Sequence, residues 1–104
     1  MILLSIESDS KTTIEKAARV LLMENLAINL NIREGTERIR IVNGSLQHAP
    51  VYELTARTKA LLFSFIDERL QKEFADEMPE LYSVPLVNIN QEQGRQLIVK
   101  VNQV

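Results

Sequence analysis

The sequence predicts an α+β domain in which a strand–helix–strand unit occurs twice. In each unit, an apolar pattern of period two leads into a helical pattern of period 3.6 and then returns to period two. The first unit spans residues 2–32 and the second spans residues 51–89. Between them, Asn43-Gly44 marks a tight hairpin turn, because both residues tolerate the positive φ angles of a type I′ turn. Two such units joined by a hairpin describe the ferredoxin-like, or split βαβ, architecture, with residues 1–104 forming one domain.

The first unit opens with a strand over residues 2–6, in which apolar side chains alternate. Ser8-Asp9-Ser10 then supplies oxygens that can cap a helix, and Thr12 with Glu15 fits a capping box. Apolar residues recur at helical spacing beyond this point and form one stripe. We therefore expect an amphipathic helix over residues 11–26.

The hairpin that follows is predicted to be long. Residues 28–32 and 37–42 both alternate, and Gly35 between them indicates a bulge or bend. Pro50 has no backbone N–H to donate to a strand ladder. We therefore expect the returning strand to be kinked, bulged or at a sheet edge near this proline.

The turn at Asn43-Gly44 also fixes which side chains share a face of the hairpin. Pairing across it sets Ile41 opposite Leu46 and Ile39 opposite His48. One face of the hairpin should therefore carry three large apolar side chains and the histidine. In an isolated chain this face would be exposed to water.

The second unit is expected to contain a helix over residues 59–74, with Thr58 as its cap. A strand over residues 81–89 should follow, interrupted by Pro85. The tail at residues 91–104 is consistent with a short third helix. The apolar side chains expected on the buried faces of these two helices are Leu62, Phe63, Phe65, Ile66, Leu70 and Phe74, and then Leu97, Ile98 and Val101.

Composition excludes several classes of function. The chain has no cysteine, which removes disulfides, thiolate metal sites and thiol nucleophiles. The net charge is −2 and the basic residues are dispersed, so neither nucleic acid nor an anionic membrane is an expected partner. No apolar run approaches the length of a membrane span. Acidic Glu7 and Asp9 follow the apolar start, which is not typical of a signal peptide, and we expect a cytoplasmic protein.

Candidate chemical groups are few. The three glycines are isolated, so no phosphate-binding loop is present, and no polar residues are spaced as a catalytic set. We therefore expect that the protein is not an enzyme and that it holds no cofactor other than a weakly bound divalent metal. His48 is the single imidazole, and it would hold a divalent metal weakly unless carboxylates or symmetry-related copies joined it. The alternative interpretation is that His48 is a half-buried structural residue. Arg57 and Arg33 are candidates for binding a small anion or ligand, although each could equally pair with a local carboxylate.

Five segments follow the order of one family's motifs. Residues 17–29 look like the family's first helix and its lysine-leucine-alanine-alanine-cysteine end, and residues 32–35 stand at its isoleucine-proline-glycine turn. Asn43-Gly44-Ser45 stands at its hairpin tip, and Arg57-Thr58 stands at its lysine-threonine junction. Residues 79–86 look like its proline-glutamate and leucine-proline strand. In this order and spacing, the chain resembles the CutA family of divalent-cation tolerance proteins, in the PII-like trimeric ferredoxin-fold group.

The departures from that pattern concern metal binding. Asn29 stands at the family's cysteine position, and residues 74–78 replace its histidine-proline-tyrosine segment. The hairpin tryptophan and the aromatic residues of the last helix are also missing. The resemblance therefore implies the fold and a homotrimer, while the residues proposed to hold copper in the family are absent.

The expected interface of that trimer follows from apolar strand residues in excess of what one core can use. They are Ile39, Ile41 and Leu46 on the hairpin and Val84 and Leu86 on the last strand. The alternative is a monomer in which the C-terminal segment covers the open face of the sheet. Two functions are then consistent with the sequence: a CutA-like homotrimer in divalent metal-ion tolerance or homeostasis, or a PII-like module that senses a small ligand or contacts a partner protein.

Overall fold

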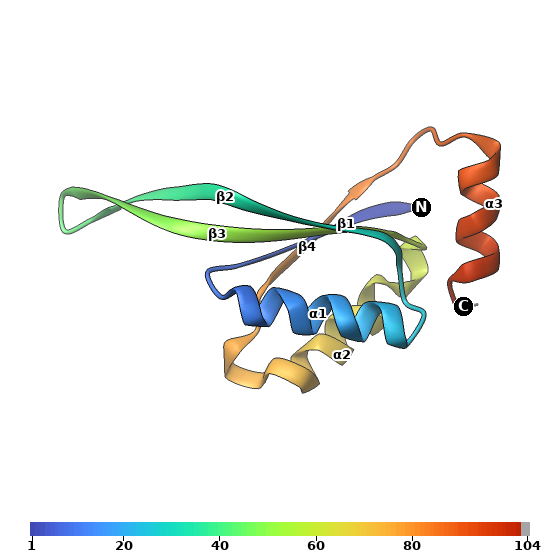
Figure 1. The fold of residues 1–104 in the computed structure, drawn as a ribbon, viewed down its shortest axis with the longest axis horizontal. Coiled ribbons are helices and arrows are strands. Elements are labelled where there is room, and N and C mark those ends of the chain that lie inside the picture. Colours follow the sequence, from blue (N-terminus) through green and yellow to red (C-terminus); the bar gives the residue numbers. More distant parts are fainter. Residues whose placement is uncertain (103–104) are drawn as a thin grey trace.

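A computed structural model describes residues 1–102 and confirms the α+β, ferredoxin-like fold (Figure 1). The strands pair antiparallel in the order β2-β3-β1-β4. A 3₁₀ turn lies on each side of the second helix, at Ala60–Leu62 and Ala75–Glu77. The elements in chain order are β1 (Ile2–Ser8), α1 (Lys11–Met23), β2 (Ile28–Val42), β3 (Ser45–Thr58), α2 (Phe63–Phe74), β4 (Glu80–Pro85) and α3 (Gln91–Lys100).

The core lies between the sheet and the two helices α1 and α2, which cover one of its faces (Figure 1). Side chains that alternate along the strands meet side chains that recur at helical spacing, as the two periods predict. Among the largest fully buried side chains are Leu4 and Ile6 of β1, Leu54 of β3, Ile14 and Leu21 of α1, and Ile66 and Leu70 of α2.

α1 begins as expected and ends earlier than expected. It starts at the predicted Lys11, and the expected cap from Ser8-Asp9-Ser10 is confirmed, because the Ser10 Oγ accepts a hydrogen bond from the Thr13 backbone N–H at 3.3 Å. The predicted Thr12–Glu15 capping box was wrong. The helix ends at Met23, before its predicted end. Asn25 has a φ of 55°, a left-handed conformation that asparagine tolerates and that stops a helix.

The start and the buried face of α2 also differ. Thr58 does not cap the helix, because its hydroxyl is buried and donates to the Leu26 carbonyl oxygen at 2.6 Å. The chain instead enters α2 through the 3₁₀ turn at Ala60–Leu62. Phe65 was expected in the core, but 52% of it is exposed. The residue lies about 100° around the helix from buried Ile66, which places it outside a narrow apolar stripe.

The last strand is shorter than the predicted span of residues 81–89. β4 ends at Pro85, a residue that cannot donate a ladder hydrogen bond. The next residue, Leu86, donates its backbone N–H to the Met1 carbonyl oxygen at 3.1 Å.

The expected third helix is confirmed as α3, at the end of the sheet farthest from the hairpin tip (Figure 1). Asn90 caps it by accepting the Gln93 backbone N–H at 2.9 Å. Leu97 and Val101 are buried in the core, whereas Ile98 is exposed, contrary to expectation. The last two residues of the predicted helical span, 103 and 104, lie outside the described residues.

The hairpin of β2 and β3 projects beyond the helices and gives the molecule its long axis of 49 Å (Figure 1). The bulge expected at Gly35 is confirmed, since the register shifts there and Gly35 has a φ of 83°. β1 pairs with β3 only as far as Tyr52, so residues 36–51 form a two-stranded segment that we call the overhang. Pro50 pairs with Glu37 within it, where β3 has one strand neighbour, which confirms the edge position among the expected alternatives.

Candidate functional site

The candidate functional surface is the overhang. Its turn has the predicted geometry, with φ angles of 51° at Asn43 and 79° at Gly44. The register is also as predicted, because Ile41 pairs with Leu46 and Ile39 pairs with His48. Cross-strand partners point to the same face of a ladder. The expected apolar face therefore exists.

This apolar face is uncovered in the single chain. The exposed fractions are 58% for Ile39, 74% for Ile41 and 67% for Leu46. Burying one such side chain fully is worth about 1.5–3 kcal/mol, so leaving several in water is unfavourable. Contiguous exposed apolar side chains of this kind are typical of an interaction surface.

The two β4 positions expected in the interface differ from each other. Val84 is 47% exposed and faces the side of the sheet without α1 and α2, since it pairs with Leu3. Leu86 is half-buried and lies just after β4. Of these two predicted positions, therefore, only Val84 offers exposed apolar surface on the strand itself.

The candidate metal ligand His48 has one carboxylate beside it. Its Nδ1 lies 3.2 Å from Oε2 of Glu37, and both side chains are more than half exposed. Structural zinc sites use four ligands, and catalytic ones use three from the protein. Within residues 1–102, no group of three or more histidine, aspartate and glutamate residues could hold a metal ion. The His48–Glu37 pair therefore does not fit a closed metal centre in one chain.

The two candidate anion-binding arginines are not brought together. Arg57 pairs with Leu3 and Arg33 pairs with Glu53, so they lie four positions apart along β3, or about 13 Å. Arg57 donates from Nη1 to the Gln93 Oε1 at 2.9 Å, a contact that fixes it against α3. An anion site at either arginine stays a prediction.

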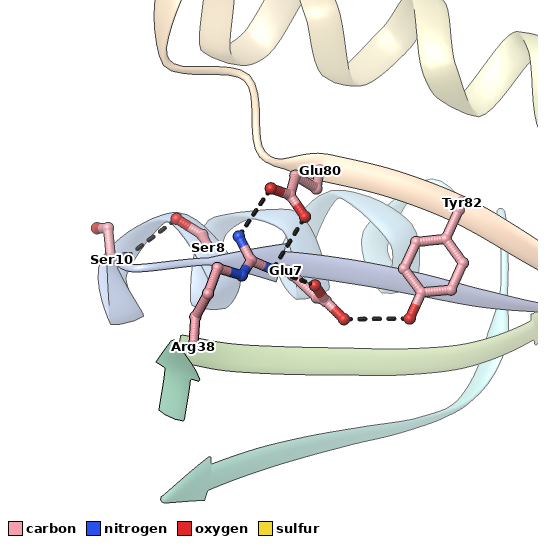
Figure 2. A network of polar contacts seen from close by, with 6 residues as sticks. All are labelled: Glu7, Ser8, Ser10, Arg38, Glu80 and Tyr82. Atoms are coloured by element: carbon pink, nitrogen blue, oxygen red, sulfur yellow. Dashed lines mark hydrogen bonds and ion pairs between the residues drawn. The ribbon is translucent and has the colours of Figure 1, made fainter. Parts of the chain in front are cut away.

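A polar network at the base of the overhang was not found from the sequence (Figure 2). Arg38 of β2 donates from Nη1 and Nη2 to the two carboxylate oxygens of Glu80 at 2.8 and 3.0 Å. Its Nη2 also donates to Oε2 of Glu7 at 2.6 Å. The Tyr82 hydroxyl donates to the other Glu7 oxygen, Oε1, at 3.1 Å. One guanidinium thus joins β2 to both β1 and β4.

The electrostatics of this network favour a charged arginine. Hydrogen bonding to Glu80, with the negative charges of Glu80 and Glu7, raises the pKa of Arg38 above its ordinary value. Partial burial acts in the opposite direction and is outweighed. Arg38 therefore holds its charge at any physiological pH. This positive charge offsets the repulsion between the carboxylates of Glu7 on β1 and Glu80 on β4.

The network lies beside a surface depression of about 530 Å³. Four carboxylates and two guanidinium groups line it, so it carries an excess of negative charge. Ser10, which also lines the depression, donates its backbone N–H to the Ser8 Oγ at 3.0 Å, as drawn in Figure 2. The acidic lining does not favour binding of an anion. The charged residues that line it are Glu7, Asp9, Glu77, Glu80, Arg38 and Arg40.

One sequence signal for the network did exist. Arg38 and Arg40 alternate with Ile39 and Ile41, which places the arginines on the hairpin face opposite the apolar one. The carboxylates that Arg38 meets are 31 and 42 residues away along the chain. Local patterns predict the face that an arginine occupies, but they do not predict a partner at such separation.

Among the described residues, no helix is both long enough and apolar enough to cross a membrane.

Comparison with known proteins gives a consistent result. The chain matches a solved structure of a divalent cation tolerance protein from Thermus thermophilus, with 23% identity and a TM-score of 0.83, over 98% of this chain and 100% of that one. It matches CutA1 from Pyrococcus horikoshii with 19% identity and a TM-score of 0.85, over 99% and 100% of the two chains. A periplasmic CutA from Archaeoglobus fulgidus matches with 18% identity and a TM-score of 0.82, over 98% and 100%.

These structural matches show a shared fold, at identities too low to show more. No curated protein sequence is significantly similar to the chain. A family model described as the CutA1 divalent ion tolerance protein matches residues 2–95, which is most of the chain. The resemblance noted in the sequence is thereby confirmed, and the protein belongs to the CutA1 divalent ion tolerance family.

Proposed function

We propose that this protein acts in divalent metal-ion tolerance as a homotrimer and binds divalent cations only weakly. Family membership supports the role in ion tolerance. The single observation that carries the assembly is the exposed apolar face of the overhang, where Ile41 is 74% exposed and Leu46 is 67% exposed. A second copy of the chain that packed on this face would remove both side chains from water.

Unpaired sheet edges support the same assembly. β2 and β4 are the two edge strands, and each presents backbone groups that can pair with another chain. Closed cyclic symmetry satisfies such edges without open-ended growth. A trimer built from the overhang of one copy and β4 of the next would use Ile39, Ile41, Leu46, Val84 and Leu86.

The monomer alternative is less well supported. It requires α3 to cover the open face, but α3 stands at one end of the sheet and buries only Leu97 and the adjoining Val101 (Figure 1). The overhang lies at the opposite end, out of reach of α3 (Figure 1). Light scattering at micromolar concentration tests the assembly. A mass near three times the chain mass of 11.9 kDa supports it, and a mass near 11.9 kDa refutes it.

Weak metal binding follows from the ligands at hand. His48 and Glu37 provide one imidazole and one carboxylate, and copper favours soft sulfur or several imidazole ligands. Calorimetry with Cu(II) at neutral pH should show a dissociation constant above about 1 µM. A tighter site near one ion per chain would contradict this, and its loss in His48→Ala would identify the ligand. Glu53→Gln, which removes a carboxylate elsewhere on β3, is the matched control.

Three finer expectations remain proposals. A role without catalysis is one of them, and membership of the CutA1 divalent ion tolerance family supports it. The absence of the family's usual metal ligands is another, since Asn29 replaces its cysteine and residues 74–78 replace its histidine-proline-tyrosine segment. This absence would account for weak binding. A cytoplasmic location stays a prediction, because the relative from Archaeoglobus fulgidus is described as periplasmic.

A further inference from the structure

The overhang is nearly detached from the rest of the molecule. Of residues 36–51, only Val51 is buried and only Arg38 is half-buried, and all the others are exposed. A two-stranded ribbon without further support is marginally stable in water. Its direction relative to the sheet therefore depends on whatever contacts tie its base to the body.

Arg38 supplies the polar contacts that do so. Within the described residues, every side-chain hydrogen bond or ion pair from the overhang to the rest of the chain comes from Arg38. The other overhang pair, His48 with Glu37, is internal. A guanidinium that forks onto one carboxylate and reaches a second is fixed in direction as well as in distance. Arg38 therefore restrains the angle at which the overhang leaves the sheet.

The same network reaches the second part of the proposed interface. Arg38 precedes Ile39 on the overhang, and Tyr82, at the other end of the network, lies two residues before Val84 on β4. Glu7 stands between them and uses one carboxylate oxygen for Arg38 and the other for Tyr82. Arg38, Glu7 and Tyr82 thus link the base of the overhang to β4 (Figure 2).

We propose that Arg38 is a positioning residue that locks the overhang to β1 and β4, so that the apolar side chains of the overhang meet a second copy in a fixed direction. The second half of this proposal rests on the proposed assembly. Preorganisation of this kind favours association, because the segment need not be ordered when the partner binds.

Arg38→Gln tests the lock, with Arg40→Gln as the matched control. Arg40 lies two residues further along the same hairpin face and makes no hydrogen bond or ion pair among the described residues. Amide hydrogen exchange should show hydrogen-bonded overhang amides such as that of Gln47 exchanging about tenfold faster in Arg38→Gln, with the β1 amide of Leu4 unchanged. Arg40→Gln should change neither.

Light scattering over a dilution series gives the second readout. Arg38→Gln should raise the concentration at which the assembly dissociates by about tenfold, and Arg40→Gln should not. The double variant Arg38→Glu with Glu80→Arg restores one guanidinium between two carboxylates and should recover both readouts. If Arg38→Gln does not fold, Arg38→Lys keeps the charge without the fork and serves in its place.

Two results would overturn the lock. One is overhang exchange in Arg38→Gln that equals that of Arg40→Gln. The other is equal acceleration in β1 and in the overhang, which would assign Arg38 to general stability. A wild-type protein that is monomeric at every concentration would instead refute the proposed trimer and the assembly half of this proposal, while the exchange readout would still decide whether Arg38 positions the overhang.

Discussion

The body of the molecule and its overhang use the same strand pattern with opposite results. In β1 and the second half of β3, alternating apolar residues such as Leu4 and Leu54 are fully buried. In the overhang, Ile39 and Ile41 alternate in the same way and are exposed. The difference lies in what packs on the strands, since α1 and α2 cover the body and stop short of the overhang (Figure 1). Alternating apolar residues predict that one face of a strand must be buried, but they do not predict which element or which chain buries it.

The largest expected effect contrasts a body residue with an overhang residue. Leu54→Ala should lower the free energy of unfolding by about 2–5 kcal/mol, because it leaves a cavity in a closed core. Ile41→Ala should change the stability of an isolated chain by no more than about 0.5 kcal/mol, because Ile41 is exposed there. Its effect should appear instead through assembly.

Urea unfolding at two protein concentrations separates these cases. The loss from Leu54→Ala should be the same at both, whereas the loss from Ile41→Ala should depend on concentration, as linkage to association requires. Equal, concentration-independent losses would show that the overhang residue belongs to the core after all.

The next effect concerns the turn that sets the face of the overhang. Gly44→Val should cost about 1–3 kcal/mol, because a β-branched residue is strained at a positive φ. Gly44 has a φ of 79° and open space around its Cα, so strain and not a clash would be responsible. Gly44→Asn, which tolerates positive φ, is the control and should lose less. Unchanged melting temperature and mass in Gly44→Val would show that the turn does not fix the register.

A glycine in the body should respond in the opposite direction. Gly94 lies inside α3, and an added Cβ would meet the Ile89 Cγ2 at 3.7 Å, which is ordinary contact. Gly94→Ala should therefore raise the stability by about 0.4–1 kcal/mol, since it restricts the unfolded chain and favours the helix. Thermal unfolding measures the change, and a lowered melting temperature would show that α3 packs too closely for a methyl group.

The smallest effect is a pH dependence confined to α3. Hydrogen bonds from Arg95, and then from Gln96, lower the pKa of Glu92 below its ordinary value of 4.5. A carboxylate whose pKa is lower in the folded state stabilises it above the unfolded pKa, and this contribution is lost as the pH falls through the folded pKa. Solvent screens so exposed a pair, so the change should be slight.

The protection factors of the α3 amides, which are corrected for the intrinsic exchange rate at each pH, should therefore fall below about pH 4.5 in the wild type, and this step should be absent in Glu92→Gln. The overhang, which contains neither residue, should show no matching step. A step of the same size in Glu92→Gln would assign the pH dependence to other carboxylates.

The sequence by itself determined the features that depend on near neighbours. The two periods predicted the strands, helices and fold class, and Asn43-Gly44 predicted the pairing of Ile41 with Leu46. Gly35 predicted the bulge. These features follow from backbone conformation over a few residues, which the local residue types largely set.

The tertiary structure alone decided the features that depend on distant partners. Thr58 donates a hydrogen bond to the Leu26 carbonyl oxygen and does not cap a helix. Phe65 lies outside the buried stripe of α2. Arg38 meets Glu7 and Glu80 because the bulge and the order of the strands bring the base of the hairpin beside β1 and β4. Periodicity limits the face on which each side chain lies, but the contact itself depends on how separated strands are arranged, and no local pattern records that arrangement.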